Sequence, residues 1–476
     1  MQFIILAALL ATLAHSEAAA ALDAVPPLHS ALLASEQWRL LLIALTALAA
    51  PFATACDGGW FVVRLRRSAL QKGVQWEQAG HRYERLQLAA LWLWLGAVIA
   101  MIYVLNWPTL VRKTWQWETW PLIDDALVLS PVIGSLLLVW LTFYFVERTA
   151  RWLRTANSTA TDAKPVQTGS LLAYLAWQCR HYLAMALVPA FIVLAIQDLA
   201  DYFGEAESFA AVASRYAGWL LIPALVAIAV GLPLLLRRLW PTVDMPADAL
   251  RRKLEVISQE MQTPLSRVLI WQTQGRLANA AVAGLSSYCR YLFLTDALLV
   301  QLAPTEIAAV VRHELGHLQR RHLALRLLLL ALPALAWLAM QPLLGSDVDL
   351  LGASPYSLAV SAAYLAYAAL AVGTYSKWLE YDADLSAVFD RRGLLNAESA
   401  RDLIHALAVL QGPYRESRFS HLLHPPTANR IAWIRKVLMH PAAGIAYRRR
   451  LDQVAATLYA ATFVIIGVAV IGAALL

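Results

Sequence analysis

The sequence predicts a mainly α-helical bundle that crosses a membrane several times and carries a small α+β domain outside the lipid. Three observations support this fold class. Of the 476 residues, 60% are hydrophobic and only 15% are charged, a composition close to that of a polytopic membrane protein. Long apolar runs recur along the chain. The segments between the later runs are more polar, and one of them contains the sequence His313-Glu314-Leu315-Gly316-His317.

Apolar runs long enough, or nearly long enough, to cross a bilayer define the expected bundle. They cover residues 40–56, 86–105, 126–146, 182–199, 216–236, 323–344, 355–375 and 454–476. Residues 1–23 precede them as a possible signal peptide or a short apolar N-terminus. Because no basic residue precedes the apolar part of this segment, the sequence leaves its cleavage open.

Charges in the connecting loops predict the orientation of the spans. The connections after the first and third runs are rich in arginine and lysine, whereas those after the second and fourth carry more acidic residues. Because short cytoplasmic loops carry an excess of basic residues, we expect the first and third connections to lie in the cytoplasm. The compact loops favour a bacterial inner membrane. The predicted regions are a transmembrane part of about five spans at 24–236, a cytoplasmic segment at 237–322, a transmembrane hairpin at 323–375, a cytoplasmic helical segment at 376–453 and a C-terminal span at 454–476.

The two cytoplasmic segments together predict the small α+β domain. Extended stretches at 268–271, 277–283 and 291–294 are separated by turns that contain glycine, which suits a small sheet. Amphipathic patterns at 399–410 and 427–437 predict two helices. An exposed edge of such a sheet would allow an extended peptide to add as a further strand.

The sequence from 313 to 317 has the spacing of a metal-binding helix. A helix places residues four apart on the same face, so His313 and His317 can point their imidazoles at one metal ion. Glu314 lies beside the first histidine, where its carboxylate can take a proton from a water at the metal. The pattern therefore predicts two of the ligands of a zinc site together with a general base. The alternative is that these residue types share a helix face by chance.

An acidic residue on a second helix is the expected third ligand, because catalytic zinc usually takes three protein ligands. Glu380 is the best candidate in the sequence. Asp384 follows it by four residues, so one helix face can carry a ligand and a carboxylate that orients a ligating imidazole.

Three blocks of the chain together resemble one family. They are the motif from 313 to 317, the pair Glu380 and Asp384, and His424-Pro425 followed by Arg430. In order and spacing they are similar to the integral-membrane zinc metallopeptidases that include the type I CAAX prenyl endopeptidase and the bacterial heat-shock protease HtpX. The resemblance covers roughly residues 254–438. It implies a zincin-type (gluzincin) catalytic domain with one Zn²⁺ per chain.

The resemblance also implies substrate-binding and further catalytic residues. Asn279-Ala280-Ala281 is similar to a strand that pairs with the backbone of the substrate. We expect His424 or Arg430 to face the oxyanion of the tetrahedral intermediate; the alternatives are ordinary packing and, for the arginine, binding of lipid phosphate.

His322 is a further histidine near the motif, five residues beyond His317. In a continuous helix this offset points its ring away from the metal face, so we do not expect it to be a ligand.

These residues predict a membrane-bound zinc endopeptidase that hydrolyses peptide bonds of membrane-associated or unfolded proteins at the cytoplasmic face. Its expected partners are protein or peptide substrates and membrane lipids. The net charge of +7 is explained by cytoplasmic loops that face anionic lipid, so no nucleic-acid partner is expected. Two alternatives stay open: a signalling-type membrane metalloprotease that cleaves one specific regulator, and a non-catalytic membrane scaffold that retains the fold.

Overall fold

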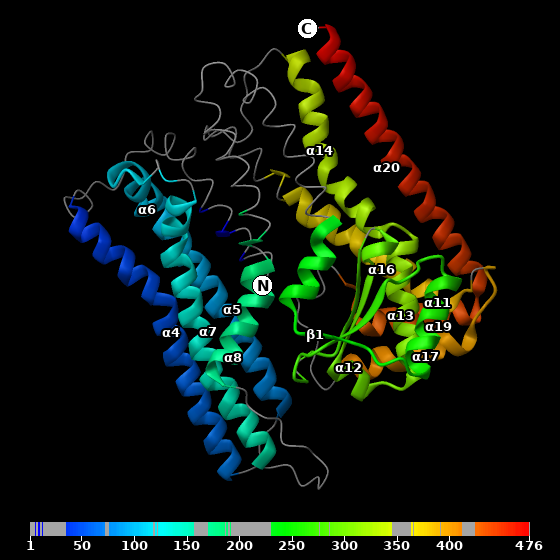
Figure 1. The fold of residues 1–476 in the computed structure, drawn as a ribbon, viewed down its shortest axis with the longest axis horizontal. Helices are drawn as coiled ribbons and strands as arrows, with labels where there is room; N and C mark the ends of the chain where they lie inside the picture. Colours follow the sequence, from blue (N-terminus) through cyan, green and yellow to red (C-terminus); the bar gives the residue numbers. More distant parts are fainter. Residues whose placement is uncertain are drawn as a thin grey trace. The chain divides into compact units, whose positions relative to one another are not determined.

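The computed structural model describes residues 35–71, 76–156, 170–191, 230–344, 363–411 and 424–475, apart from a few positions inside these ranges, and four residues near the N-terminus. The chain divides into two compact units, Met1–Gly231 and Leu232–Leu476 (Figure 1). The first unit is helical. The second contains a small sheet, the helices around it and two long helices.

Three long helices make up most of the described part of the first unit: α4 (Glu36–Gln71), α5 (Trp76–Ile99) and α7 (Ile123–Ala156). Each is long and apolar enough to cross a membrane. Trp94 of α5 is fully buried, and its indole N–H donates a hydrogen bond to Ser135 Oγ of α7 at 3.0 Å. The unit also contains α8 (Leu171–Gln178) and the short helical segments Ala100–Val104, Trp107–Thr109 (α6), Leu110–Thr114 and Cys179–Leu183.

Four helices of the described residues have the length and composition of membrane spans, at Glu36–Leu70, Gln78–Val104, Ile123–Ala150 and Pro441–Val468. They contain or overlap the predicted runs 40–56, 86–105, 126–146 and 454–476. The run 323–344 lies in the helix α14 (His322–Leu344). Most of the runs 182–199 and 216–236, part of the run 355–375 and nearly all of residues 1–23 lie outside the described residues. The orientation of the spans stays a prediction.

The second unit contains a mixed sheet of four strands. The sheet forms one side of the domain that carries the motif at 313–317. Its strands are β1 (Thr242–Asp244), β2 (Arg267–Trp271), β3 (Ala280–Ala283) and β4 (Tyr291–Thr295), in the order β1-β2-β4-β3. β2 pairs in parallel with β4, and the other two pairs are antiparallel. β3 is therefore an edge strand. Strands β2, β3 and β4 lie where the sequence predicted extended structure, whereas β1 was not predicted.

Helices pack around this sheet and around each other to form the core of the domain. The central helix α13 packs against β3, α11, α16 and α17. Its first turn is stabilised by Pro304 at the N-terminal position and by Glu306, whose carboxylate accepts a hydrogen bond from the N–H of Ala303. The helices of this unit are α11 (Ala249–Glu260), α12 (Asp296–Gln301), α13 (Pro304–Gln319), α14, α16 (Gly373–Val388), α17 (Ala397–Gln411), α19 (Thr427–Met439) and α20 (Pro441–Leu475), with the short segments Ser287–Cys289 and Ala368–Val372.

Two long helices of this unit, α14 and α20, pack against each other and project beyond the domain (Figure 1). Each is anchored in the domain at its N-terminal end. Leu325 of α14 and Leu451 of α20 are buried in one cluster with Tyr375 and Leu379, which lie on α16. The helix that follows the metal motif and the C-terminal helix therefore meet at α16.

A glycine allows α13 and α16 to approach closely. A Cβ atom added at Gly316 would lie 2.7 Å from Ser386 Cβ and 2.5 Å from Ser386 Oγ. Real Cβ atoms do not come this close to other carbon atoms, so any larger residue would force the two helices apart. Gly316 lies between the two motif histidines in the sequence, and the contact therefore sets the distance from the motif to α16.

We expect Gly316→Ala to destabilise the protein. Relief of the glycine's helix penalty gains only about 0.5–1 kcal/mol, whereas overpacking of a well-packed contact costs about 1–3 kcal/mol. The measurement is the thermal unfolding midpoint in detergent. Gly96→Ala in α5 is the control, because a Cβ there meets no atom within 4 Å. Ser386→Gly should cost less stability in the Gly316→Ala background than in the wild type; purely additive effects would contradict the proposed contact.

Candidate metal centre

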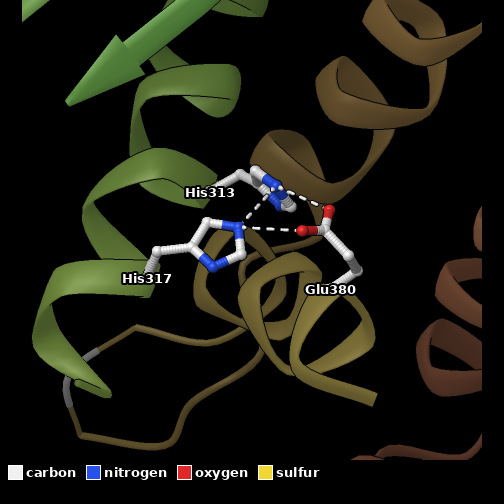
Figure 2. A group of neighbouring side chains, drawn as sticks. All are labelled: His313, His317 and Glu380. Atoms are coloured by element: carbon white, nitrogen blue, oxygen red, sulfur yellow. Dashed lines mark hydrogen bonds and ion pairs between the residues drawn. The ribbon is translucent and has the colours of Figure 1, made fainter. Parts of the chain in front are cut away.

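The two motif histidines and one carboxylate converge at a single point between α13 and α16 (Figure 2). His313 and His317 project from α13, and their Nε2 atoms lie 3.3 Å apart. Glu380 projects from α16, and its oxygens lie 3.6 Å from Nε2 of His313 and 3.4 Å from Nε2 of His317. Two imidazole nitrogens and a carboxylate therefore face one another with no side chain between them.

This donor set fits zinc. Zinc takes imidazole nitrogen and carboxylate oxygen at about 2.0–2.2 Å in a tetrahedral arrangement, which places neighbouring donor atoms about 3.3 Å apart. The three separations between 3.3 and 3.6 Å match that requirement. Three protein ligands also leave the fourth position open, as in catalytic rather than structural zinc sites.

The buried carboxylate of Asp384 and the guanidinium of Arg430 contact His313 on the Nδ1 side of its ring. Asp384 Oδ1 lies 2.9 Å from Nδ1 of His313, so the nitrogen that does not face Glu380 has an acceptor. The guanidinium of Arg430 binds both oxygens of Asp384, at 2.5 and 3.0 Å. Burial by itself would raise the pKa of Asp384, but the charge of Arg430 and the hydrogen bond from His313 outweigh it and lower that pKa. Asp384 therefore stays ionised and can orient the imidazole.

His424 lies at the rim of the site. Its side chain is 57% exposed, and Nδ1 lies 3.1 Å from Oε2 of Glu380. The side chain of Arg430 is only 12% exposed, and its Nη2 lies 3.3 Å from Nδ1 of His313 in addition to its contacts with Asp384. Both residues that the sequence suggested for oxyanion binding therefore lie beside the candidate ligands, and His424 is the more exposed of the two.

The predicted substrate strand is the edge strand β3, which packs against α13. Ala280 pairs with Leu294 and Ala281 with Phe293 on one side of the strand. Asn279 precedes the strand; its N–H donates to Thr295 Oγ1, and its side-chain oxygen accepts from the N–H of Ala280. Among the described residues no strand pairs with the other side of β3.

The structure adds two residues that contact the candidate ligands, Arg326 and His322, and a third, Asp382, that contacts His322. Arg326 of α14 lies 3.3 Å from Oε1 of Glu380. His322 Nδ1 lies 2.8 Å from Nδ1 of His317, and His322 Nε2 lies 3.0 Å from Asp382. His322 is outside the converging group of ligand atoms, as expected, but it contacts a ligand. The alternation Glu380-Tyr-Asp382-Ala-Asp384 was a signal in the sequence that a second carboxylate could take part.

Burial and electrostatic interactions at the centre together lower the pKa of Glu380 and of Asp384, and raise the pKa of His313 and of Glu314. Burial and the charge of Arg430 lower the pKa of His313, but hydrogen bonds to Asp384 and Glu380 outweigh both and raise it to about 9. Burial raises the pKa of Glu314 to about 7, and the charges of His313, Arg430 and His424 oppose this rise. A bound cation would favour the ionised form of Glu314 further.

Zinc affinity is expected to fall as the pH falls. A ligating imidazole must give up its extra proton, and His313 with a pKa of about 9 carries that proton at neutral pH when no metal is bound. Apparent affinity should therefore drop about tenfold per pH unit below pH 9, as measured by chelator competition between about pH 6 and pH 8. Asp384→Asn should reduce this slope by lowering the pKa of His313. An affinity independent of pH would contradict the ion-paired state of this histidine.

Comparisons with known proteins give a family match and a similar solved structure. Residues 245–438 match the model of peptidase family M48. Among solved structures, the crystal structure of S. mikatae Ste24p is similar, with a TM-score of 0.47 and 14% sequence identity over 82% of this chain and 98% of that one. No curated protein matches.

The matched segment contains every residue of the centre described above, from β3 through α13 and α16 to Arg430. The chain also has helices long and apolar enough to cross a membrane. Residues 245–438 therefore match a peptidase family M48 domain, in the part of the chain where the sequence resembles membrane zinc metallopeptidases.

Proposed function

We propose that this protein is a membrane-bound zinc metalloendopeptidase that hydrolyses peptide bonds of membrane-associated or unfolded proteins at the cytoplasmic face. The observation that carries the proposal is the convergence of two Nε2 atoms and Glu380 within 3.6 Å, on the helix turn that also carries Glu314. A scaffold without catalysis would have no need of a general base next to a complete ligand set.

The residues of the chain have separate roles in the proposed reaction. When bound, a zinc ion supplies a Lewis acid that polarises the peptide carbonyl and lowers the pKa of a water. Glu314 accepts the proton of the attacking water and passes it to the leaving amine. The charges of His313, Glu380, Arg430 and His424 all shift the pKa of this carboxyl, which supports its assignment to the same site. A pKa near neutrality suits a group that both accepts and donates a proton.

The environment of the site supports binding of an extended substrate. The unpaired side of β3 can accept a substrate strand through backbone hydrogen bonds at Ala280 and Ala281, with Asn279 at its start. His424 is exposed and charged when protonated, so it can donate a hydrogen bond to the oxyanion. Arg430 is engaged with Asp384, so we assign it to holding that carboxylate and to the positive field of the site.

Glu314→Gln is expected to lower cleavage of casein by about 10²–10⁴-fold, because general acid–base catalysis is lost. The variant should still hold one zinc per chain, since the three ligands are intact. Glu380→Gln should lose both activity and most of the zinc. The measurements are casein cleavage and zinc content of each detergent-purified protein.

The matched control for these variants is Glu398→Gln, an exposed residue in the first turn of α17. This variant should leave both casein cleavage and zinc content unchanged. A wild-type protein that holds zinc but does not cleave casein would favour the signalling alternative with one specific substrate. Full activity of Glu314→Gln would contradict the assigned base.

The cytoplasmic location can be tested by cysteine labelling. The chain has three free cysteines, Cys56, Cys179 and Cys289, which can be replaced. In that background Glu398→Cys should react with a membrane-impermeant maleimide only in inside-out vesicles. Lys113→Cys, in a connection predicted to lie outside, should react only in right-side-out vesicles. The opposite pattern would reverse the proposed topology.

A further inference from the structure

Each motif histidine has a second ring nitrogen that points away from the converging ligand atoms. For His313 that nitrogen meets the carboxylate of Asp384. For His317 it meets another imidazole: Nδ1 of His322 lies 2.8 Å away. His322 is 1% exposed, so its ring has almost no access to bulk solvent. His322 therefore contacts the outer nitrogen of His317, as Asp384 contacts the outer nitrogen of His313.

The proton positions in this contact follow from the bonds at both ends. A ring that offers the lone pair of Nε2 to a metal carries its proton on Nδ1, so His317 donates and Nδ1 of His322 accepts. His322 then carries its proton on Nε2. That nitrogen lies 3.0 Å from Oδ2 of Asp382, which can only accept. Each of the two hydrogen bonds thus has one donor and one acceptor, with His322 neutral.

Asp382 is held in place by two arginines from different elements. Arg320 donates through Nε to Oδ2 at 2.8 Å, and Arg448 of α20 donates through Nε to Oδ1 at 3.1 Å. Asp382 is fully buried. Burial by itself would raise the pKa of this carboxyl, but the hydrogen bond from His322 and the charges of Arg448 and Arg320 lower it. The acceptor at the end of the chain of hydrogen bonds is therefore fixed and ionised.

A sharp turn in the backbone brings His322 to this position. α13 ends at Gln319, and α14 begins at His322. Arg321 between them has a φ of 54°, in the left-handed region that residues other than glycine rarely adopt. In a continuous helix His322 would point away from His317; the turn redirects it towards the ligand.

We propose that His322 is a positioning residue of the metal site, which fixes the tautomer and ring orientation of His317 by accepting its Nδ1–H and is itself fixed by Asp382. The inference rests on the proposed function in that it takes His317 as a metal ligand. Through Arg448 the same chain of contacts connects the metal site with the C-terminal helix α20.

Two variants of nearly equal shape test the accepting role. Asparagine at 322 keeps an oxygen near the position of Nδ1, whereas leucine fills the same space without an acceptor, and both lose the bond to Asp382. We expect His322→Leu to weaken zinc binding by about 10–100-fold in the full-length, detergent-purified chain. His322→Asn should retain most of the wild-type affinity. The readouts are chelator competition with zinc alone and the visible spectrum of the cobalt-substituted protein, which reports ligand geometry.

Leu325→Ala is the structural control. Leu325 is buried one turn further along α14 and touches none of these hydrogen bonds. It should lower the thermal unfolding midpoint but leave zinc affinity and the cobalt spectrum unchanged. Equal zinc affinity of His322→Leu and His322→Asn, or a wild-type cobalt spectrum in the leucine variant, would overturn the proposal.

A measurement on the wild-type chain covers the case in which the variants do not fold. With ¹⁵N-labelled histidine, nuclear magnetic resonance should show the zinc-bound chain with a proton on Nδ1 of His317 and on Nε2, not Nδ1, of His322. A proton on Nδ1 of His322 would exclude its accepting role. None of these readouts uses proteolysis, so a wild type that fails to cleave casein would remove the proposed function and leave this inference intact.

Discussion

The close packing of α13 against α16 is the constraint on which the metal centre depends. One helix supplies both histidines and the other supplies Glu380, so the ligand atoms meet only at a fixed separation between the helix backbones. Gly316 lies at the contact, and Ser386 occupies the space that a side chain there would need. A motif glycine that could be taken for a simple spacer is thus a packing requirement.

The second constraint is that α16 buries several carboxylates, whose charges must be compensated by cationic partners. Glu380, Asp382 and Asp384 are each 2% exposed or less. An unpaired charge in such a place costs several kcal/mol, about 3–5 when one partner of a buried pair is removed. Arginines from three other elements compensate them: Arg430 on α19 for Asp384, Arg448 on α20 for Asp382, and Arg326 on α14 for Glu380.

This arrangement explains why parts of the chain far apart in the sequence belong to one site. Arg448 lies more than one hundred residues beyond the motif, yet it contacts the carboxylate that holds His322. The C-terminal helix is therefore part of the support of the metal centre, in addition to its apolar contact with α14. Loss of any one of these arginines would remove part of the compensation for a buried carboxylate.

The sequence by itself determined the fold class, the family that the domain matches and the grouping of the three candidate ligands. Local spacing is sufficient for this: residues four apart share a helix face whatever the tertiary structure, which is why His313 with His317 and Glu380 with Asp384 could be paired in advance. Apolar runs in the sequence similarly predicted segments that the structure describes as long helices. The domain boundaries, the orientation and the roles of Asn279, His424 and Arg430 stay predictions.

Only the tertiary structure decided what surrounds the ligands. The position of His322 depends on a turn at Arg321 that a continuous helical pattern conceals, and the role of Asp382 depends on arginines that no local spacing connects to it. The contact of Arg430, which with His424 was a candidate for the oxyanion, with Asp384 likewise depends on the approach of α19 to α16. The physical reason is common to all three: hydrogen bonds and ion pairs act over a few ångströms in space, and helix periodicity gives no information about which distant segments come that close.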